Sequence, residues 1–260
     1  MSHHDAELAE MAGGFIHEIK NHLGTLGLNL QLLAEDFAEP ENQRERRALT
    51  RVLKLQSQCQ HLVDVSNDFL RFARIKDLNL VSTDLNKIVE DMIDFYGPTA
   101  QASSIQITSF LPADLPHVWL DEDLFRQALL NLMLNASQAM PDGGKLTIQA
   151  AVEPNSTTTQ LDADDSTTRS SGPMLALHLI DTGKGMELEV LSKIFEPFYS
   201  TKKTGSGLGL PTTKRIIEAH RGTIFVESEA GRGTKFTIHL PIQDVNGQDP
   251  PAQDVDSSGP

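Results

Sequence analysis

Apolar residues near the start of the chain recur at the spacing of an amphipathic helix. They follow steps of three and four, with one irregular step between Ile19 and Leu23. The apolar positions are Leu8, Ala12, Phe15, Ile19, Leu23, Leu26, Leu30, Leu33 and Phe37. This heptad-like seam ends at a polar turn, Glu39 to Asn42, where Pro40 disfavours helix in the residue before it. The pattern predicts one long helix before the turn.

A second amphipathic helix is predicted after the turn. Its apolar face comprises Leu49, Val52, Leu55, Cys59, Leu62, Phe69 and Phe72, widened by Leu53, Val63, Leu70 and Ala73. Two such helices joined by a short turn make a helical hairpin. One hairpin leaves a broad apolar stripe in water, and two hairpins packed as a four-helix bundle bury it. We therefore expect residues 1–78 to form a homodimer.

Strands and helices interleave in the rest of the chain. We expect a helix capped by Asp84, a second from Asp121 to Met140, and a third near Leu210 to Ala219. Apolar residues alternate, as in strands, at Ile105/Ile107, Leu146/Ile148/Ala150, Leu175/Leu177/Leu179, Ile224/Val226 and Phe236/Ile238/Leu240. This order predicts an α+β sandwich over residues 84–242, with helices on one face of a sheet.

Two polar stretches are predicted to lack regular structure. Residues 154–173 are rich in Thr, Ser and Asp and separate two predicted strands, so we expect a long loop. The tail, residues 243–260, is rich in Pro, Asp, Gln and Ser.

The composition is that of an ordinary globular protein, with 39% hydrophobic and 22% charged residues. The formal net charge of −14 argues against nucleic acid or anionic lipid as the main partner. There is neither an apolar run of about 18 residues nor a signal peptide, and we expect a cytosolic protein. The single cysteine, Cys59, excludes an internal disulfide and a cysteine-cluster metal site.

The first motif with chemical potential is His17-Glu-Ile-Lys-Asn21 on the first helix. If Phe15 and Ile19 point inward, His17 lies about 200° around the helix from each and points outward. An exposed imidazole beside Glu18 is a candidate nucleophile with its base. A solvated surface histidine gives the same local pattern.

The second motif places Asn131 and Asn135 on one face of a predicted helix, at i and i+4. Their amides interrupt an apolar segment, and buried amides need partners. They either cap backbone groups or bind a hydrated Mg²⁺ and phosphates.

Three glycine-rich or aromatic motifs follow. Asp181-Thr-Gly-Lys-Gly-Met186 comes directly after a strand, where a carboxylate can accept the exocyclic amine of a purine and glycines allow close approach of the ring. Phe195 to Lys202 carries aromatics around Glu-Pro, with Lys202 able to neutralise phosphate. Gly205-Ser-Gly-Leu-Gly-Leu210 opens a helix, whose N-terminal amides favour phosphate. These glycines fit neither a Rossmann fingerprint nor a P-loop, which needs Gly-Lys-Ser/Thr after them.

In this order, the five motifs resemble the H, N, G1, F and G2 boxes of bacterial two-component sensor histidine kinases, over roughly Glu7 to Leu240. Gly231-Arg-Gly-Thr234 is similar to the last element of that family's ATP site. The resemblance implies a HisKA-type dimerisation hairpin in residues 1–78 and a GHKL (Bergerat) ATP-binding domain in residues 84–242. The F box ends in Ser-Thr-Lys, which most resembles the nitrogen-regulation (NtrB-type) subgroup.

The resemblance also implies roles for the reacting residues. His17 accepts the γ-phosphoryl group of ATP, Glu18 is its general base, and Asn21 positions water for dephosphorylating a partner. Asn135 binds Mg²⁺ and Asn131 assists at the phosphates. The implied partner is the receiver domain of a response regulator, whose aspartate takes the phosphoryl group.

In the nucleotide pocket, the resemblance implies that Asp181 binds adenine. The residues implied around the nucleotide are Gly183, Gly185, Lys202, Gly205, Gly207, Leu208, Gly209 and Thr234. The segment from Gly185 to Gly205 is the implied ATP lid. The nucleophile lies on another domain, so Leu78 to Thr83 is expected to act as a hinge.

Three departures from the family pattern stand out. His22 replaces the proline that often follows the H-box Asn, and is a second candidate phosphoryl acceptor. His220-Arg221-Gly222 replaces the more usual His-Gly-Gly, with no consequence that the sequence reveals. No sensor domain precedes the hairpin, so the input is expected from a separate protein, the N-terminal residues or a missing part.

Other functions remain open at this point. A non-catalytic signalling scaffold would keep the dimer and nucleotide pocket without phosphorylation. An ATPase clamp or an anti-sigma serine kinase would share the GHKL domain but lacks a hairpin bearing His-Glu-x-x-Asn. A chain acting mainly as a phosphatase is compatible with Asn21.

Overall fold

The computed structural model describes residues 3–73, 75, 78–153, 173–202 and 205–242, with only the backbone for residues 3–18. The tail expected at 243–260, and all but Pro173 of the loop expected at 154–173, lie outside these residues. By its internal contacts the chain divides into two compact units. Met1–Ile75 and Glu196–Pro211 form the first, and Lys76–Phe195 and Thr212–Pro260 form the second.

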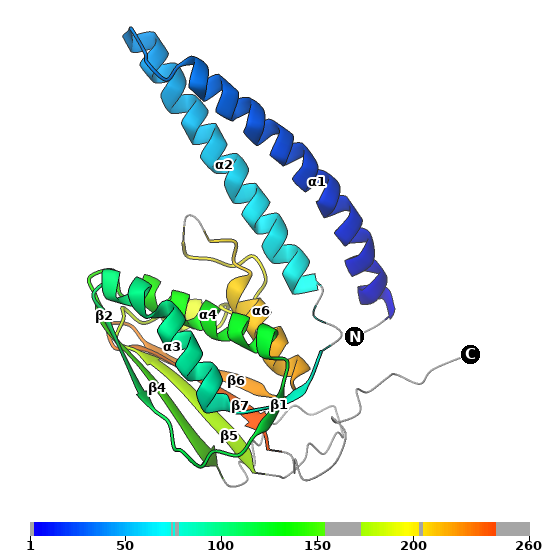
Figure 1. Ribbon diagram of the computed structural model, residues 1–260, viewed down its shortest axis with the longest axis vertical. Coiled ribbons are helices and arrows are strands. Elements are labelled where there is room, and N and C mark those ends of the chain that lie inside the picture. The colour runs from blue at the N-terminus through cyan, green and yellow to red at the C-terminus, as the bar shows by residue number, and fades with distance from the viewer. Residues whose placement is uncertain (1–2, 74, 76–77, 154–172, 203–204, 243–260) are drawn as a thin grey trace. The chain divides into compact units, whose positions relative to one another are not determined.

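The first unit contains the two predicted helices, α1 (His3–Asp36) and α2 (Gln43–Ala73), which run antiparallel (Figure 1). Asn42 caps the start of α2, because its Oδ1 accepts the backbone N–H groups of Arg44 and Glu45, both at 3.0 Å. Across the pair, the Cys59 thiol donates to the Leu23 carbonyl at 3.0 Å. Cys59 is therefore a buried residue between the helices, as expected.

The apolar seam of α1 and α2 is only partly covered. Leu30, Val52 and Cys59 are buried, with Leu23 and Ala34 packed against them. Other seam residues stay in solvent: Leu26, Leu55 and Leu62 are each 51% exposed and Leu33 is 41% exposed. One copy of the hairpin thus leaves a stripe of large apolar side chains open.

The second unit is built on a mixed five-stranded sheet of order β2-β4-β5-β7-β6. The strands are β2 (Ile105–Phe110), β4 (Gly144–Glu153), β5 (Met174–Asp181), β6 (Thr223–Glu229) and β7 (Gly233–Pro241). β2 pairs with β4 in parallel, and the other neighbours are antiparallel. The alternating apolar residues of the sequence lie in these strands, as predicted.

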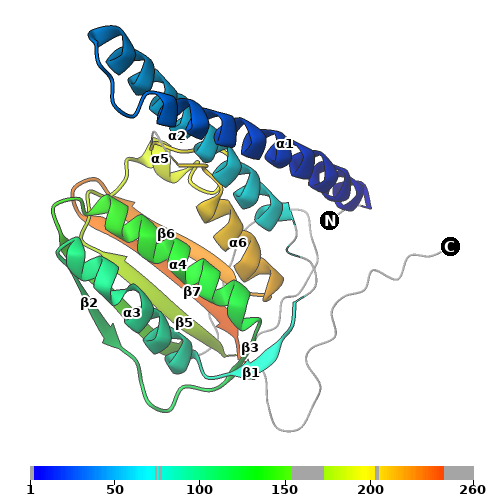
Figure 2. The same cartoon turned by 45° about the horizontal axis from the view of Figure 1, so that its top comes forward.

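Helices α3 (Leu85–Ala102), α4 (Glu122–Ala139) and α6 (Gly209–Ala219) lie on one face of this sheet (Figure 2), and α5 is a short turn of helix, Leu188–Leu191. The predicted N-cap is confirmed, because Asp84 accepts from the Asn86 N–H. Asp121, predicted as the first helical residue, is instead the N-cap of α4 and accepts from the Leu124 N–H. The largest fully buried side chains include Phe125, Leu129, Leu132, Leu146, Leu175, Leu177 and Ile216. The predicted sandwich of sheet and helices is therefore present.

The linker contains a strand that the sequence did not predict. Val81–Thr83, the end of the expected hinge, forms strand β1 and pairs antiparallel with β3, Val118–Leu120. Each strand has three residues, too few for an alternating pattern to appear in the sequence. The segment available for hinge motion is thus shorter than expected.

No helix within the described ranges combines the length and the apolar character that crossing a bilayer requires.

Candidate functional site

Asp181 is the last residue of β5, rather than the first residue after the strand as the sequence suggested. The sheet register places it opposite Thr234 on β7. It is only 5% exposed. Its Oδ1 accepts two backbone hydrogen bonds, from Gly183 N–H at 2.8 Å and from Thr234 N–H at 3.2 Å. Burial raises the pKa of the Asp181 carboxyl, and these two hydrogen bonds oppose the rise.

The two oxygens of Asp181 therefore differ. Oδ1 is held by two backbone donors, whereas Oδ2 accepts no hydrogen bond from any part of the chain that the structure describes. The Asp181 side chain as a whole is nearly buried, so Oδ2 has few water molecules to replace a missing donor. This atom is ready to accept a hydrogen bond from a bound molecule.

Thr234 connects Asp181 to a polar chain that crosses β7 and β6. The Thr234 hydroxyl lies 3.0 Å from the Ser228 hydroxyl, which accepts the Met186 N–H at 3.0 Å. Ser228 also donates to the Gly233 carbonyl at 2.9 Å. Ser228 could not be predicted as a site residue, because its contacts depend on the pairing of β6 with β7. These hydrogen bonds hold the loop after Asp181 against the sheet.

Two glycines of this region are required by the backbone. Gly185 has φ +63°, and a β-carbon there would collide with the Glu229 carbonyl. Gly233 has φ +89°, and its β-carbon would collide with the carbonyl of Asp181. Gly183 is also tight, since a β-carbon would lie 2.8 Å from Asp181 Oδ1. The glycine backbone is thus closely packed around Asp181.

Asn131 and Asn135 lie one turn apart on α4, and both are half-buried. The Asn131 amide donates to the Thr213 hydroxyl of α6, with Nδ2 and Oγ1 3.4 Å apart. Thr213 is fully buried. Thr213 was not predicted as a site residue, although its spacing of three and four from Ile216 and Ile217 places it on the apolar face of α6, which is a signal for such a contact. Asn131 therefore joins α4 to α6.

Apart from Phe195, the described residues of the F-box and G2-box segments belong to the first unit. Phe198 has φ +65°, a strained conformation for an aromatic residue. Its ring stacks on Phe69 of α2, with centroids 6.2 Å apart, and its N–H donates to the Gly207 carbonyl at 3.1 Å. A β-carbon on Gly207, which has φ +69°, would collide with the Phe198 backbone. Lys202 is exposed in this loop.

The end of the G2 segment leads directly into α6. Leu208 is fully buried, and Gly209 is the first residue of the helix. Gly205 is close-packed as well, because a β-carbon there would lie 2.8 Å from the Ser200 hydroxyl. These residues present backbone at a helix start, as the sequence predicted.

The expected reacting residues lie on α1. His17 and Glu18 are within the helix, but their side chains fall outside the described residues. Asn21 is exposed, and its carbonyl accepts the Thr25 hydroxyl at 3.1 Å. The outward orientation of His17 thus stays a prediction.

Comparison with known proteins identifies the second unit's fold. Residues 120–244 match the family described as "Histidine kinase-, DNA gyrase B-, and HSP90-like ATPase". The crystal structure of full-length ShkA in complex with AMPPNP is similar with a TM-score of 0.64 and 26% identity, over 89% of this chain and 45% of that one. Residues 120–244 therefore belong to a GHKL-type ATPase domain with a mixed sheet.

Similar sequences extend over almost the whole chain. It is 32% identical over 236 residues to Sporulation kinase E of Bacillus subtilis (strain 168), covering 91% of this chain and 29% of that protein. It is 32% identical over 243 residues to Signal transduction histidine-protein kinase AtoS of Escherichia coli (strain K12), covering 94% of this chain and 36% of that protein. The chain spans about a third of the length of these relatives. Both relatives are named as kinases, and AtoS is named as a signal transduction histidine-protein kinase, the class of protein that the motifs of this chain resemble.

Proposed function

We propose that this homologue of the sensor histidine kinases transfers the γ-phosphoryl group of ATP to its own His17, and then to an aspartate of a response regulator. The observation that carries the proposal is the Asp181 carboxylate, with Oδ1 held by Gly183 and Thr234 and Oδ2 available. The exocyclic amine of adenine has hydrogens to donate and matches this oxygen. A buried acceptor at the end of a strand thus selects an adenine nucleotide.

The phosphates would lie at the start of α6. There the backbone of Gly205, Gly207, Leu208 and Gly209 approaches the helix N-terminus, which favours anions. Lys202 adds a positive charge on the same loop. Asn131 would reach the phosphates from α4, where its contact with Thr213 orients it.

The residues present suit a magnesium ion that is held largely by the nucleotide. Within the described ranges there is no group of three or more His, Cys, Asp or Glu side chains able to hold a metal. Asn135 offers one hard amide oxygen on α4, and Mg²⁺ commonly takes one or two protein oxygens with phosphates and waters. When bound, Mg²⁺ neutralises charge on the transferring phosphoryl group.

In the phosphorylation step, a ring nitrogen of His17 attacks the γ-phosphorus. The bond between that phosphorus and the bridging oxygen breaks, ADP leaves, and Glu18 takes the imidazole proton. A receiver-domain aspartate then takes the phosphoryl group from His17. Asn21, one helical turn from His17, would position the water that dephosphorylates the partner.

We further propose that the hairpin dimerises as a HisKA-type four-helix bundle, as in the NtrB-type subgroup. The exposed stripe of Leu26, Leu55 and Leu62 supports this, because a second copy of the stripe would bury it. The functional domains would then be residues 1–78 and 84–242. Sedimentation of the chain should give about twice its monomer mass of 28.6 kDa.

Input would come from a sensor, either a separate protein or a part absent from this chain. The reaction draws on ATP and on a response regulator, so we place this kinase core in the cytoplasm.

Incubation with γ-labelled ATP and Mg²⁺ tests the proposal, with His17→Ala and His22→Ala as parallel variants. We expect acid-labile, base-stable label on the wild type and on His22→Ala, and none on His17→Ala. Label that disappears only with His22→Ala would move the acceptor to the neighbouring histidine. Nucleotide binding without label, even with a response regulator present, would favour a non-catalytic dimeric nucleotide-binding scaffold.

A further inference from the structure

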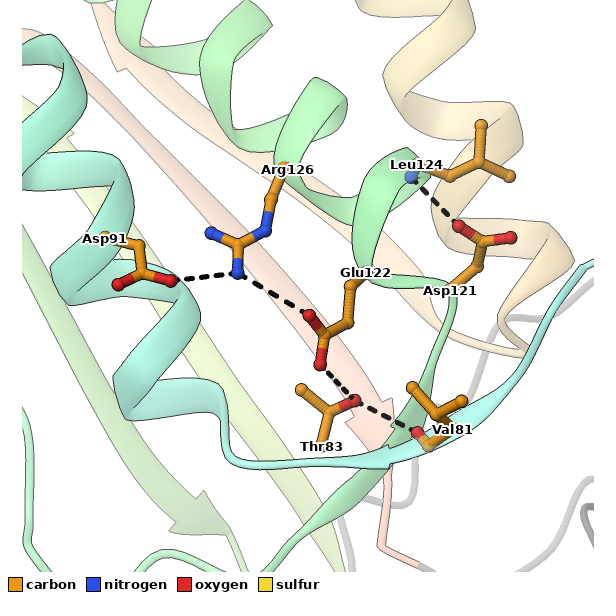
Figure 3. Close-up of polar contacts among 7 residues, drawn as sticks. All are labelled: Val81, Thr83, Asp91, Asp121, Glu122, Leu124 and Arg126. Carbon is orange, nitrogen blue, oxygen red and sulfur yellow. Dashed lines mark hydrogen bonds and ion pairs between the residues drawn. The ribbon is translucent and has the colours of Figure 1, made fainter.

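Asp121 connects three segments of the second unit that are distant in the sequence. Its Oδ2 accepts the backbone N–H of Asn79, in the linker before β1, at 3.0 Å. Its Oδ1 accepts the Leu124 N–H at 3.1 Å and so caps α4, a contact drawn in Figure 3. Its own N–H donates to His220 Nε2, just beyond the end of α6, at 2.9 Å. The linker, the start of α4 and the end of α6 therefore meet at one residue.

The hydrogen bonds of His220 define its protonation state. Its Nδ1 lies 2.7 Å from the Ile216 carbonyl, which can only accept, so Nδ1 carries the hydrogen. Nε2 faces the Asp121 N–H and must be the acceptor. His220 is 4% exposed, and its burial lowers its pKa. Only the neutral ring with hydrogen on Nδ1 satisfies both contacts.

The same two helices meet again further along. Asn131 of α4 donates to Thr213 near the start of α6. One hydrogen bond thus joins α4 and α6 beside the expected phosphate site, and another joins them where Asp121 meets His220. A shift of α4 at Asp121 would move Asn131 relative to the start of α6.

The linker side of this junction is equally well connected. β1 pairs with β3 through Val81 and Leu120, the residue before Asp121. The Thr83 hydroxyl donates to the Val81 carbonyl at 3.0 Å and lies 3.4 Å from Glu122 Oε1 on α4 (Figure 3). Hydrogen bonds therefore connect the end of the linker to β3 and to the start of α4.

We propose that Asp121 and His220 are positioning residues that couple the linker backbone at Asn79 to the helices of the nucleotide site. The proposal rests on the proposed function in that the ligand is an adenine nucleotide bound beside Asn131. Coupling is reciprocal: if linker order favours nucleotide binding, nucleotide binding must order the linker to the same degree.

Hydrogen exchange of residues 78–83, with and without AMPPNP and Mg²⁺, tests the coupling. We expect nucleotide to slow exchange of this segment about threefold to tenfold, in line with one net hydrogen bond. Asp121→Ser keeps an oxygen for the α4 cap but is too short to reach Asn79, and should remove the nucleotide effect. Asp84→Ser, at the N-cap of α3, is the matched control and should keep it.

A second pair of variants isolates the His220 contact. Gln can place its oxygen near the position of Nε2 and accept from Asp121, whereas Asn can only replace Nδ1 and donate toward Ile216. We expect His220→Gln to retain the nucleotide effect on the linker and His220→Asn to lose it. Equal behaviour of the two variants would overturn the role of His220.

The experiments distinguish a failure of the coupling from a failure of the proposed function. If nucleotide binds, as calorimetry can measure, but wild-type exchange at residues 78–83 is unchanged, the coupling is wrong and the proposed function stands. If no adenine nucleotide binds, the proposed function itself fails, and the coupling with it.

Discussion

Ser206 donates a hydrogen bond to the carboxylate of Asp68, with Oγ and Oδ2 2.7 Å apart. The same hydroxyl oxygen accepts the Leu208 N–H at 3.3 Å. Beside this contact, Phe198 stacks on Phe69. All of these residues belong to the first unit, so the glycine segment expected to hold phosphate lies against a carboxylate of α2.

The first prediction concerns the charge of Asp68. In Asp68→Asn the amide oxygen can still accept the Ser206 hydroxyl, while the negative charge near the proposed phosphate loop is lost. We expect ATP to bind about twofold to tenfold more tightly at low ionic strength, because two unit charges in water at about 4 Å interact by about 1 kcal/mol. The gain should shrink at high salt. Isothermal calorimetry at two salt concentrations measures it.

Asp64→Asn is the matched control for this prediction. Asp64 lies one helical turn before Asp68, is exposed, and accepts from Gln60 instead of the loop. Equal effects of the two substitutions would mean that the contact with Ser206 has no part in nucleotide affinity.

The second prediction separates stability from binding at Asp181. Asp181→Asn can keep Oδ1 on the Gly183 and Thr234 N–H groups, so its amide nitrogen must replace Oδ2. A donor then faces the adenine amine, and ATP affinity should fall roughly tenfold to a hundredfold. Guanine has a carbonyl at that position, so the preference for ATP over GTP should fall most. Competition between the two nucleotides gives the measurement.

The unliganded variant should be at least as stable as the wild type at neutral pH. Burial raises the pKa of Asp181 in the folded state. Its contribution to stability is therefore present at low pH and is lost as pH rises through the folded pKa. The asparagine cannot ionise, so the variant does not lose this stability at neutral pH. A lower melting temperature for Asp181→Asn at pH 7 would contradict this reasoning.

Much of the fold could be predicted from the sequence because its signals are local. Asp84 and Asp121 sit directly before apolar-periodic segments, and both are N-caps. The pairing of β1 with β3 could not be predicted, since three residues per strand give no pattern. That pairing turned the end of an expected hinge, Val81–Thr83, into a strand.

In the candidate site too, features with a local sequence signal could be predicted and contacts between distant residues could not. The sequence predicted Asp181 at the end of a strand with Gly183 and Gly185 directly after it, and the structure has this arrangement. The partners of these residues come from elsewhere in the chain. Ser228 reaches the site only through the pairing of β6 with β7, and Asp68 meets Ser206 across 138 positions. Contacts of this kind leave no trace in local spacing.

The third prediction is that the second unit loses stability in mild acid. Burial lowers the pKa of both His178 and His220, and Lys235 lowers that of His178 further. The unfolded chain takes up protons at these positions near pH 6.5, before the folded chain does. Stability is thus full above about pH 6.5 and falls as pH drops toward the folded pKa values. Denaturant unfolding between pH 7.5 and 5.5 measures the slope.

The raised pKa of Asp181 makes the folded state more stable as pH falls, which opposes the effect of the two histidines. The pH series is therefore best measured in the Asp181→Asn background. There, His178→Asn can still donate to the Thr237 hydroxyl, which lies 3.0 Å from His178 Nδ1 in the wild type. This variant should have a shallower slope. A slope that does not change would exclude His178 as a source of the pH dependence.

The last prediction uses the backbone at Ser104, the residue after the C-cap of α3. Ser104 is exposed and has φ +57°, whereas the preceding Ser103 has φ −95°. Residues other than glycine are strained in the left-handed region by roughly 1–2 kcal/mol. A glycine at this position would relieve the strain, but the greater conformational freedom of glycine in the unfolded chain offsets part of the gain. Ser104→Gly should therefore stabilise the second unit by about 0.5–1 kcal/mol. Ser103→Gly gains no such relief and should be neutral or destabilising, so a similar shift in melting temperature for both variants would contradict the assignment of strain to Ser104.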